Sequence, residues 1–182
     1  SIEDIKKLKE LSGVGLTDAK KALVEADGDF DKALKAMREK GLTKAEKRGD
    51  RETREGVIDA YIHDGRLGAI VEVNCETSFV AKTDEFKTLA HQIAMQVASM
   101  APLYVSEEDI PEEVKAAKMK ELEANFKGPE NMKEKILDGQ AKKAFADKVL
   151  MNQPYILDDT KTVAEFIKDN IAKTGENILF YE

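Results

Sequence analysis

Two β-rich runs on either side of an Asp-Gly pair constrain the fold of this chain more than any other feature of its sequence. Their apolar and aromatic residues are Val57, Ile58, Tyr61 and Ile62 before the pair, and Ala69, Ile70, Val71 and Val73 after it. Asp-Gly favours a tight turn because both residues tolerate a positive φ. The sequence therefore predicts an antiparallel hairpin that turns at Asp64 and Gly65.

Amphipathic helices are predicted after this hairpin from apolar residues that recur every three or four positions. The clearest stripe consists of Phe86, Leu89, Ala90, Ile93, Val97 and Met100. Pro102 ends this helix, another is predicted from Thr162 to Ala172, and a strand follows Gly175. Helices and antiparallel strands in separate blocks indicate the α+β class.

A projecting pair of antiparallel helices is predicted at about residues 107–152. Pro111 suits the first position of a helix, and the stretch from there to Asn125 is dense in charge. Gly128 and Pro129 separate it from a second helix that ends before Pro154. The apolar residues of this second helix are Met132, Ile136, Ala144, Phe145 and Val149. With so few apolar residues, we expect the two helices to pack thinly.

The first 42 residues predict a bundle of three short helices. The first helix has an apolar stripe of Ile2, Ile5, Leu8 and Leu11. A turn is expected at residues 12–15 (Ser-Gly-Val-Gly), after which Thr17 and Asp29 are expected to cap the second and third helices. Gly41 is expected to end the third helix. Helices this short are marginal alone, so they must pack together.

A polar stretch from Thr43 to Glu55 separates this bundle from the rest of the chain. Its charge is compatible with either a solvated helix or an extended tether. We take it as a linker, which divides the chain into an N-terminal domain (1–42), a linker (43–55) and an α+β core (56–182).

Composition argues against several classes of function. The 29 basic and 36 acidic residues give a net charge of −7, whereas a general nucleic-acid binder carries a basic face. The single cysteine, Cys75, cannot form an internal disulfide, which favours a reducing, cytoplasmic setting. No apolar run approaches the ~20 residues of a membrane span. We therefore expect a soluble protein that binds neither nucleic acid nor membrane.

Motifs for catalysis are missing from the sequence. It has no phosphate-binding glycine loop, and one cysteine with the widely separated His63 and His91 gives no metal-ligand set. Glu72 and Glu76 could serve a small enzyme, but they alternate with valines and are expected on the solvent face of a strand. These absences leave no catalytic residue, metal or cofactor to propose, although they do not by themselves exclude an enzyme.

Two stretches carry a resemblance to a known family. GVGLTDAKKAL starts at Gly13 and NCETSFVAKTDEF at Asn74. Both resemble elongation factor Ts, whose core signature is usually Asn-Cys-Glu/Gln-Thr-Asp-Phe-Val-Ala. The later stretches LAHQIAMQVA and QPYILDDTKTVAEFI are also similar, so the likeness spans nearly the whole chain. It implies a ubiquitin-associated-like N-terminal bundle and, as in the shorter bacterial form, a core that pairs as a homodimer.

The chain departs from the family pattern at three places. Ser78 stands where the signature usually has Asp, which bears on any contact that needs the charge. Leu16 and Thr17 replace the adjacent methionines of the family's glycine loop. The sequence stops at Glu182, where relatives commonly continue through a basic and aromatic strand, and this is expected to weaken dimer pairing.

The resemblance implies guanine nucleotide exchange on elongation factor Tu during translation elongation. In the family, the signature phenylalanine disturbs the magnesium and phosphate site of that GTPase so that GDP leaves. The implied contact residues are Thr77, Ser78, Phe79 and Val80 in the core and Leu16, Thr17 and Asp18 in the N-terminal module, with His63 as a further candidate.

Pattern alone leaves other interpretations open. It favours core packing for Phe79 and a small buried hydrophobe for Cys75. Leu16 is equally well read as a hydrophobic staple, and Ser78 as a helix N-cap. The three-helix bundle alone would also suit a ubiquitin-like or nascent-chain binding module, although that function leaves the core unexplained.

Overall fold

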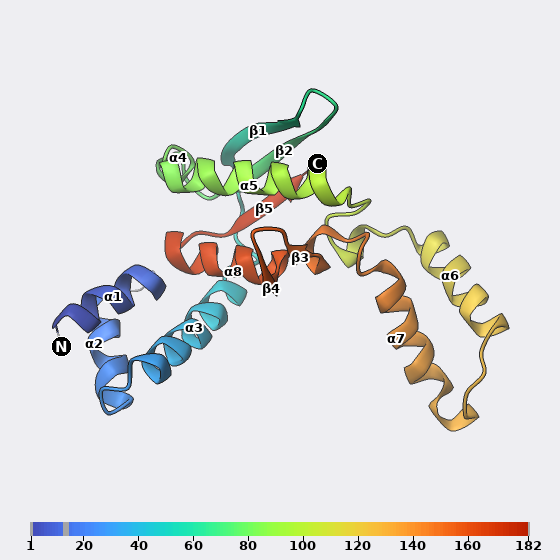
Figure 1. Cartoon of the computed structure of the whole chain (residues 1–182), viewed down its shortest axis with the longest axis horizontal. Helices are drawn as coiled ribbons and strands as arrows, with labels where there is room; N and C mark the ends of the chain where they lie inside the picture. The colour runs from blue at the N-terminus through green and yellow to red at the C-terminus, as the bar shows by residue number, and fades with distance from the viewer. Residues whose placement is uncertain (1, 13–14, 182) are drawn as a thin grey trace.

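The β-rich runs of the sequence form the centre of the protein, which we describe from a computed structural model covering residues 2–12 and 15–181 (Figure 1). Strands β1 (Glu55–His63) and β2 (Leu67–Cys75) pair antiparallel, and β5 (Ile178–Tyr181) adds to β2 in the order β1-β2-β5. The turn between β1 and β2 has positive φ at Asp64 and Gly65. The predicted hairpin, its turn and the C-terminal strand are confirmed.

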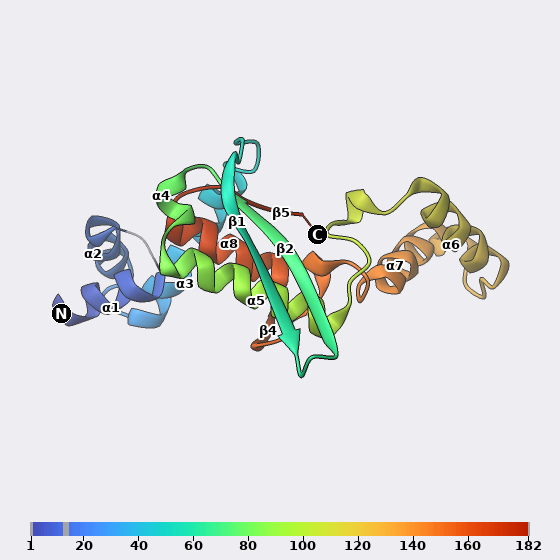
Figure 2. The same cartoon turned by 90° about the horizontal axis from the view of Figure 1, so that it is seen from above.

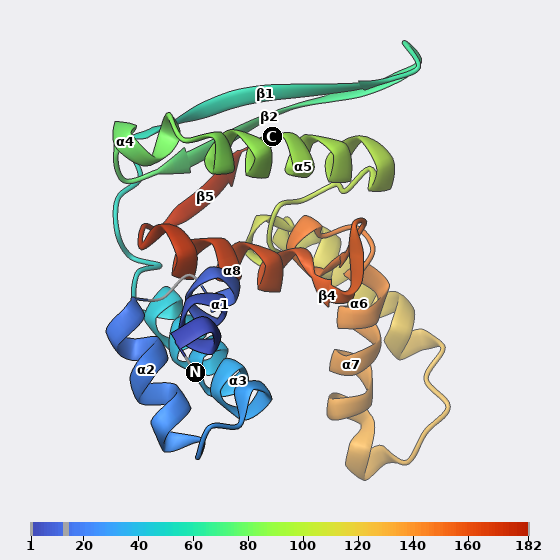
Figure 3. The ribbon, with the colours of Figure 1, turned by 60° about the vertical axis from the view of Figure 1, so that its left-hand side comes forward.

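Two amphipathic helices build the main core against this sheet. Helix α5 (Asp84–Met100) packs on β1 and β2, and α8 (Val163–Thr174) lies on the other side of α5 in Figure 3. Buried residues of both helices and of the sheet form one apolar cluster. Both predicted helices are confirmed, because their apolar stripes follow the helical period. The predicted α+β class is therefore correct.

The N-terminal bundle consists of α1 (Ile2–Ser12), α2 (Leu16–Glu25) and α3 (Phe30–Glu46). It has its own apolar cluster and lies against α8. Asp29 caps α3 as predicted, since its Oδ1 accepts from the N–H of Lys32 at 3.0 Å. The turn predicted at residues 12–15 falls on Gly13 and Val14, which lie outside the described residues.

Two predicted boundaries in this bundle are wrong. Helix α3 does not end at Gly41 but continues to Glu46. A glycine inside a helix costs only about 1 kcal/mol, and α3 gains contact with α8. Thr17 is not an N-cap, because α2 begins at Leu16 with Gly15 before it.

The stretch predicted as a linker is partly helical and partly fixed to the core. Its first residues belong to α3, and Arg48 donates from Nη1 to the carbonyl oxygen of Ile171 in α8 at 3.2 Å. Asn177 donates from Nδ2 to the carbonyl oxygens of Gly49 and Arg51 at 3.1 and 2.9 Å. The division into domains remains a prediction, but this segment does not hang free.

The predicted helical hairpin is confirmed as α6 (Glu112–Ala124) and α7 (Lys133–Phe145), which project from the core (Figure 1). Its packing is thin, since Leu137 and Phe145 are the described residues of the two helices that are buried. Short 3-10 turns flank the hairpin at Glu107–Asp109 (η1) and Leu150–Asn152 (η3), and another, Glu130–Met132 (η2), lies between its two helices. Pro111 precedes α6 as its N-cap.

The second hairpin helix is shorter than predicted. It ends at Phe145, and Val149 instead forms a bridge with Tyr104 and is buried at the root of the hairpin. A small ribbon follows that the sequence did not reveal, formed by β3 (Pro154–Tyr155) and β4 (Asp158–Thr162). Apolar residues in a β-bridge followed by a 3-10 turn can be spaced like those of a helix, so apolar spacing alone does not distinguish the two structures.

None of the helices in the described ranges combines the length and the apolarity that crossing a membrane requires. Within the same ranges, no three His, Cys, Asp or Glu side chains gather in a way that could hold a metal ion.

Candidate functional site

The signature segment after β2 forms a one-turn helix, α4 (Ser78–Ala81), beside the start of α5. Ala81 is buried, and Val80 packs against the main core. Phe79, between Ser78 and Val80, is 84% exposed. Core packing of Phe79, which the pattern alone favoured, is therefore wrong. Val80 and Ala81 pack the helix against the core, and the ring of Phe79 is left exposed to solvent.

Hydrogen bonds fix α4 at both ends. At its start, Thr77 has extended backbone and its Oγ1 accepts from the N–H of Val80 at 3.5 Å. At its end, Thr83 donates from Oγ1 to the carbonyl oxygen of Val80 at 2.8 Å and accepts from the N–H of Phe86 at 3.2 Å. Thr77, not Ser78, is thus the N-cap, and Ser78 is the first residue of the helix.

The N-terminal candidates lie together at the start of α2. Leu16 is its first residue and is 50% exposed, and Thr17 and Asp18 are also exposed. Gly15 caps the helix through its backbone, since its carbonyl oxygen accepts from the N–H of Ala19 at 3.0 Å. About half of the surface of Leu16 is therefore accessible to a partner, at the start of a helix whose position is fixed.

Helices α4 and α2 lie on the same side of the molecule, away from the hairpin of α6 and α7, in Figures 1 and 2. The core and N-terminal candidates can therefore face one large partner together. Such a two-part surface suits a protein better than a small molecule, which binds in an enclosed concave pocket.

His63 is not brought together with these residues. It ends β1 next to the turn, whereas α4 follows the opposite end of the hairpin, where Glu55 pairs with Cys75. A strand of nine residues is about 26 Å long, so the hairpin separates His63 from α4 by roughly that distance. His63 Nδ1 lies 2.9 Å from Tyr61 Oη. For His63 to contact the partner, as predicted, a separate part of that partner would have to reach the turn of the hairpin.

Cys75, at the end of β2, is completely buried, as the sequence predicted. Burial, together with the nearby Glu176 carboxylate, raises the pKa of its thiol to about 11. The thiol Sγ lies 3.3 Å from the carbonyl oxygen of Thr77. A buried thiol with a raised pKa is unreactive, so Cys75 supports the base of the signature segment rather than any thiol chemistry.

The rival interpretation of Glu72 and Glu76 as catalytic carboxylates finds little in the geometry. Glu72 is exposed on the sheet and accepts from Nδ2 of Asn74 at 2.9 Å. Glu76 follows the strand and accepts from the N–H of Asn177 at 2.7 Å. A carboxylate engaged with backbone in this way is a structural group.

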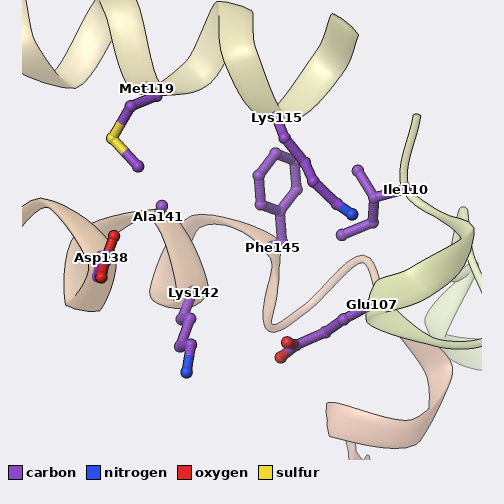
Figure 4. A pocket seen from close by; sticks show the side chains of 8 residues that line it. All are labelled: Glu107, Ile110, Lys115, Met119, Asp138, Ala141, Lys142 and Phe145. Atoms are coloured by element: carbon purple, nitrogen blue, oxygen red, sulfur yellow. The ribbon is translucent and has the colours of Figure 1, made fainter. Parts of the chain in front are cut away.

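A cleft of about 230 Å³ lies between α6 and α7 near the root of the hairpin. Figure 4 shows Met119 and Ala141 facing each other across the gap, with Phe145 beneath Lys115. Its lining is completed by Glu107, Ile110, Asp138 and Lys142. The cleft marks where the thinly packed helices separate, and it is remote from α4 (Figure 1).

Comparison with known proteins agrees with the motifs. The family model described as Elongation factor TS matches residues 5–181. The chain belongs to this family. The Elongation factor Ts of Thermotoga maritima is 52% identical over 98% of this chain and 90% of its own length. Those of Coprothermobacter proteolyticus and Moorella thermoacetica are each 48% identical, over 96% and 97% of this chain and 91% and 89% of their own lengths.

Family membership agrees with the resemblance found in the two motifs, but sequence reasoning missed the residues that hold the signature in place. Glu176 accepts from Thr77 through both of its carboxylate oxygens, and Asn177 is buried beside it. Both belong to the stretch between α8 and β5, about a hundred residues away in the sequence. Local patterns carry no signal for such pairs, although two polar residues directly before an apolar strand are a weak hint.

Proposed function

We propose that this member of the elongation factor Ts family is a guanine nucleotide exchange factor for elongation factor Tu in translation elongation. It acts by protein binding and not by catalysis of bond chemistry, and needs no cofactor. The observation that carries the proposal is Phe79, an exposed aromatic ring on a short helix fixed at both ends, within the family's signature segment.

In the proposed mechanism, Phe79 inserts into the nucleotide domain of the GTPase and disturbs its magnesium and phosphate site. Burying a phenylalanine contributes roughly 1.5–3 kcal/mol. By linkage, a partner that weakens GDP binding must itself be bound less tightly when GDP is present. Each tenfold weakening of GDP binding corresponds to about 1.4 kcal/mol, so one buried ring can drive a substantial part of the exchange.

Thr77, Ser78 and Val80 have supporting parts in this proposal. Thr77 and Val80 set the direction of α4, and the partly exposed Ser78 lies next to the inserted ring. Leu16, Thr17 and Asp18 provide the second contact. Two contacts on one rigid scaffold raise the effective concentration of each for its own site, which favours insertion of the ring once the N-terminal module is bound.

We also propose that the chain forms a homodimer through the outer face of its sheet. Ile58 and Ile62 of β1 and Ile70 of β2 are all strongly exposed on that face and lie next to one another, whereas Leu179 and Tyr181 of β5 lie beyond Glu72 and Asn74 of β2. An exposed apolar patch on a sheet favours burial against a second copy. Contact through this face leaves α4 free for the GTPase.

The test is release of fluorescently labelled GDP from elongation factor Tu with catalytic amounts of this chain. We expect a marked acceleration at micromolar concentration, and its absence would contradict the proposal. A matched control is Leu103→Ala, which shortens another exposed apolar residue. Leu103 follows the far end of α5, about 25 Å from α4 by helix length, so this variant should retain full activity.

A further inference from the structure

The ladder between β2 and β5 ends at the pair Cys75 and Ile178, but its register continues through side chains. Glu76 would next face Asn177, and its Oε1 accepts from the N–H of Asn177 at 2.7 Å. Thr77 would then face Glu176, and its N–H donates to Oε2 of Glu176 at 3.0 Å. Each segment thus presents a carboxylate to a backbone N–H of the other, in place of the ladder carbonyls.

Glu176 also binds the N-cap residue of α4. Its second oxygen, Oε1, accepts from Oγ1 of Thr77 at 2.6 Å, and the same Oγ1 accepts from the N–H of Val80. Hydrogen bonds to a carboxylate are shorter and about twice as strong as neutral ones. A continuous path of hydrogen bonds therefore runs from Glu176 through Thr77 into the helix that presents Phe79.

Asn177 connects the same point to the N-terminal half of the chain. Its side chain is buried, and both Nδ2 bonds go to the segment after α3, to the carbonyl oxygens of Gly49 and Arg51. Nη1 of Arg51 in turn lies 3.4 Å from Oε1 of Glu76. Glu176 and Asn177, which are consecutive in the sequence, thereby hold both the signature segment and the chain that leads from the N-terminal bundle.

We propose that Glu176 and Asn177 are positioning residues for exchange: they fix the direction of Phe79 and tie it to the segment leading from the N-terminal contact surface. This inference rests on the proposed exchange function. Neither residue needs to touch the GTPase, since Glu176 acts through Thr77 and Asn177 acts through the backbone of Gly49 and Arg51.

The first test measures the direction of residue 79 without any partner. The chain has no tryptophan, so Phe79→Trp places a single tryptophan, which can be excited apart from the tyrosines, at a site that is 84% exposed and needs no repacking. Glu176→Gln in that background leaves only one acceptor oxygen for the two bonds from Thr77. We expect faster local motion of the tryptophan, seen as lower fluorescence anisotropy at unchanged far-ultraviolet circular dichroism.

A matched control exists in the same chain. Glu165 accepts from the N–H of Thr162 at 2.8 Å and from its hydroxyl at 3.3 Å, at the start of α8. Glu165→Gln thus removes a similar carboxylate–threonine pair elsewhere and should leave the anisotropy unchanged. Thr77→Val should lower it as Glu176→Gln does, whereas Thr77→Ser, which keeps the hydroxyl, should retain the parent value. Unchanged anisotropy in both Glu176→Gln and Thr77→Val would overturn the inference.

The second test uses GDP release from elongation factor Tu with Phe79 retained. Glu176→Gln should lower the maximal release rate about tenfold, while the half-saturating concentration changes less than about threefold because the contact surfaces remain. A loss that follows only the unfolded fraction would indicate a merely structural role and overturn the positioning claim. If the unmodified chain releases no GDP, the exchange proposal fails, and the anisotropy result still decides whether Glu176 fixes α4.

Discussion

Truncation of Phe79 separates a binding role from a packing role, because the structure gives opposite expectations for the two. A phenylalanine side chain that is fully buried covers 150–250 Å² and costs about 3–5 kcal/mol when replaced by alanine. Phe79 is 84% exposed, so about one sixth of its surface is covered in the free chain. At about 25 cal/mol per Å², this leaves less than about 1 kcal/mol to lose.

The expected effect on exchange is much larger. If the ring is buried in the partner, its removal should cost at least about 2 kcal/mol, which is a loss of about thirtyfold in the exchange rate. The same variant should unfold in urea within about 1 kcal/mol of the parent chain. Exchange and unfolding must be measured on the same preparation, so that a loss of folded protein is not mistaken for a loss of function.

Phe86 provides the matched control seven residues away, since it is 1% exposed and starts the apolar stripe of α5. Phe86→Ala should lower the free energy of unfolding by about 3–5 kcal/mol. Its exchange rate, corrected for the folded fraction, should fall less than that of Phe79→Ala. A Phe79→Ala variant that is badly destabilised, or one that exchanges at the parental rate, would refute the reasoning.

Ser78→Asp restores the residue that the family usually has, and faster GDP release would show that the carboxylate contributes to the contact, whereas an unchanged rate would show that Ser78 is an equivalent substitute. Iodoacetamide should modify Cys75 at least about 100-fold more slowly at pH 8 in the folded chain than in urea, because the thiol is completely buried and its pKa rises from 9.0 to about 11; equal rates of modification would contradict this. The chain should also lose stability to urea as the pH rises from 9 towards 11, since the unfolded state ionises its thiol first, and a free energy of unfolding that stays constant over this range would contradict the raised pKa. Ile70→Lys should convert a dimer into a monomer at tens of micromolar in sedimentation equilibrium, because it buries an unpaired charge at the proposed interface, and a variant that dimerises like the parent would rule out that face.

The parts of the fold that the sequence predicted are those with a regular local pattern. The hairpin of β1 and β2 follows from Asp64 and Gly65, whose positive φ values the turn requires. Helix α5 follows from a stripe that holds its period over about four turns. In both cases the interactions that decide the structure join residues near one another in the sequence, so the pattern carries the information.

Where the prediction failed, a tertiary contact decided the outcome. Packing against α8 carries α3 past Gly41, and the bridge between Tyr104 and Val149 replaces the last turns of a helix. Pattern alone favours the core for Phe79 because it is an apolar residue between a strand and a helix, and a helix of four residues is too short to show a period that would place the ring outside. The link from Glu176 to Thr77 has no local pattern that would predict it, since 99 residues separate the two.

The failures at the candidate site itself have a physical reason. An isolated helix of one turn is unstable in water, because closing the first turn fixes several dihedral angles for a single hydrogen bond. Helix α4 therefore depends on contacts outside itself, through Thr77 to Glu176 at one end and through Thr83 at the other. A ring presented from such a helix is already ordered before it meets a partner, so binding does not have to supply that conformational entropy. The affinity of the site for a partner thus depends both on the side chain that makes the contact and on distant residues that do not touch the partner. Only the contacting side chain can be recognised from a signature motif.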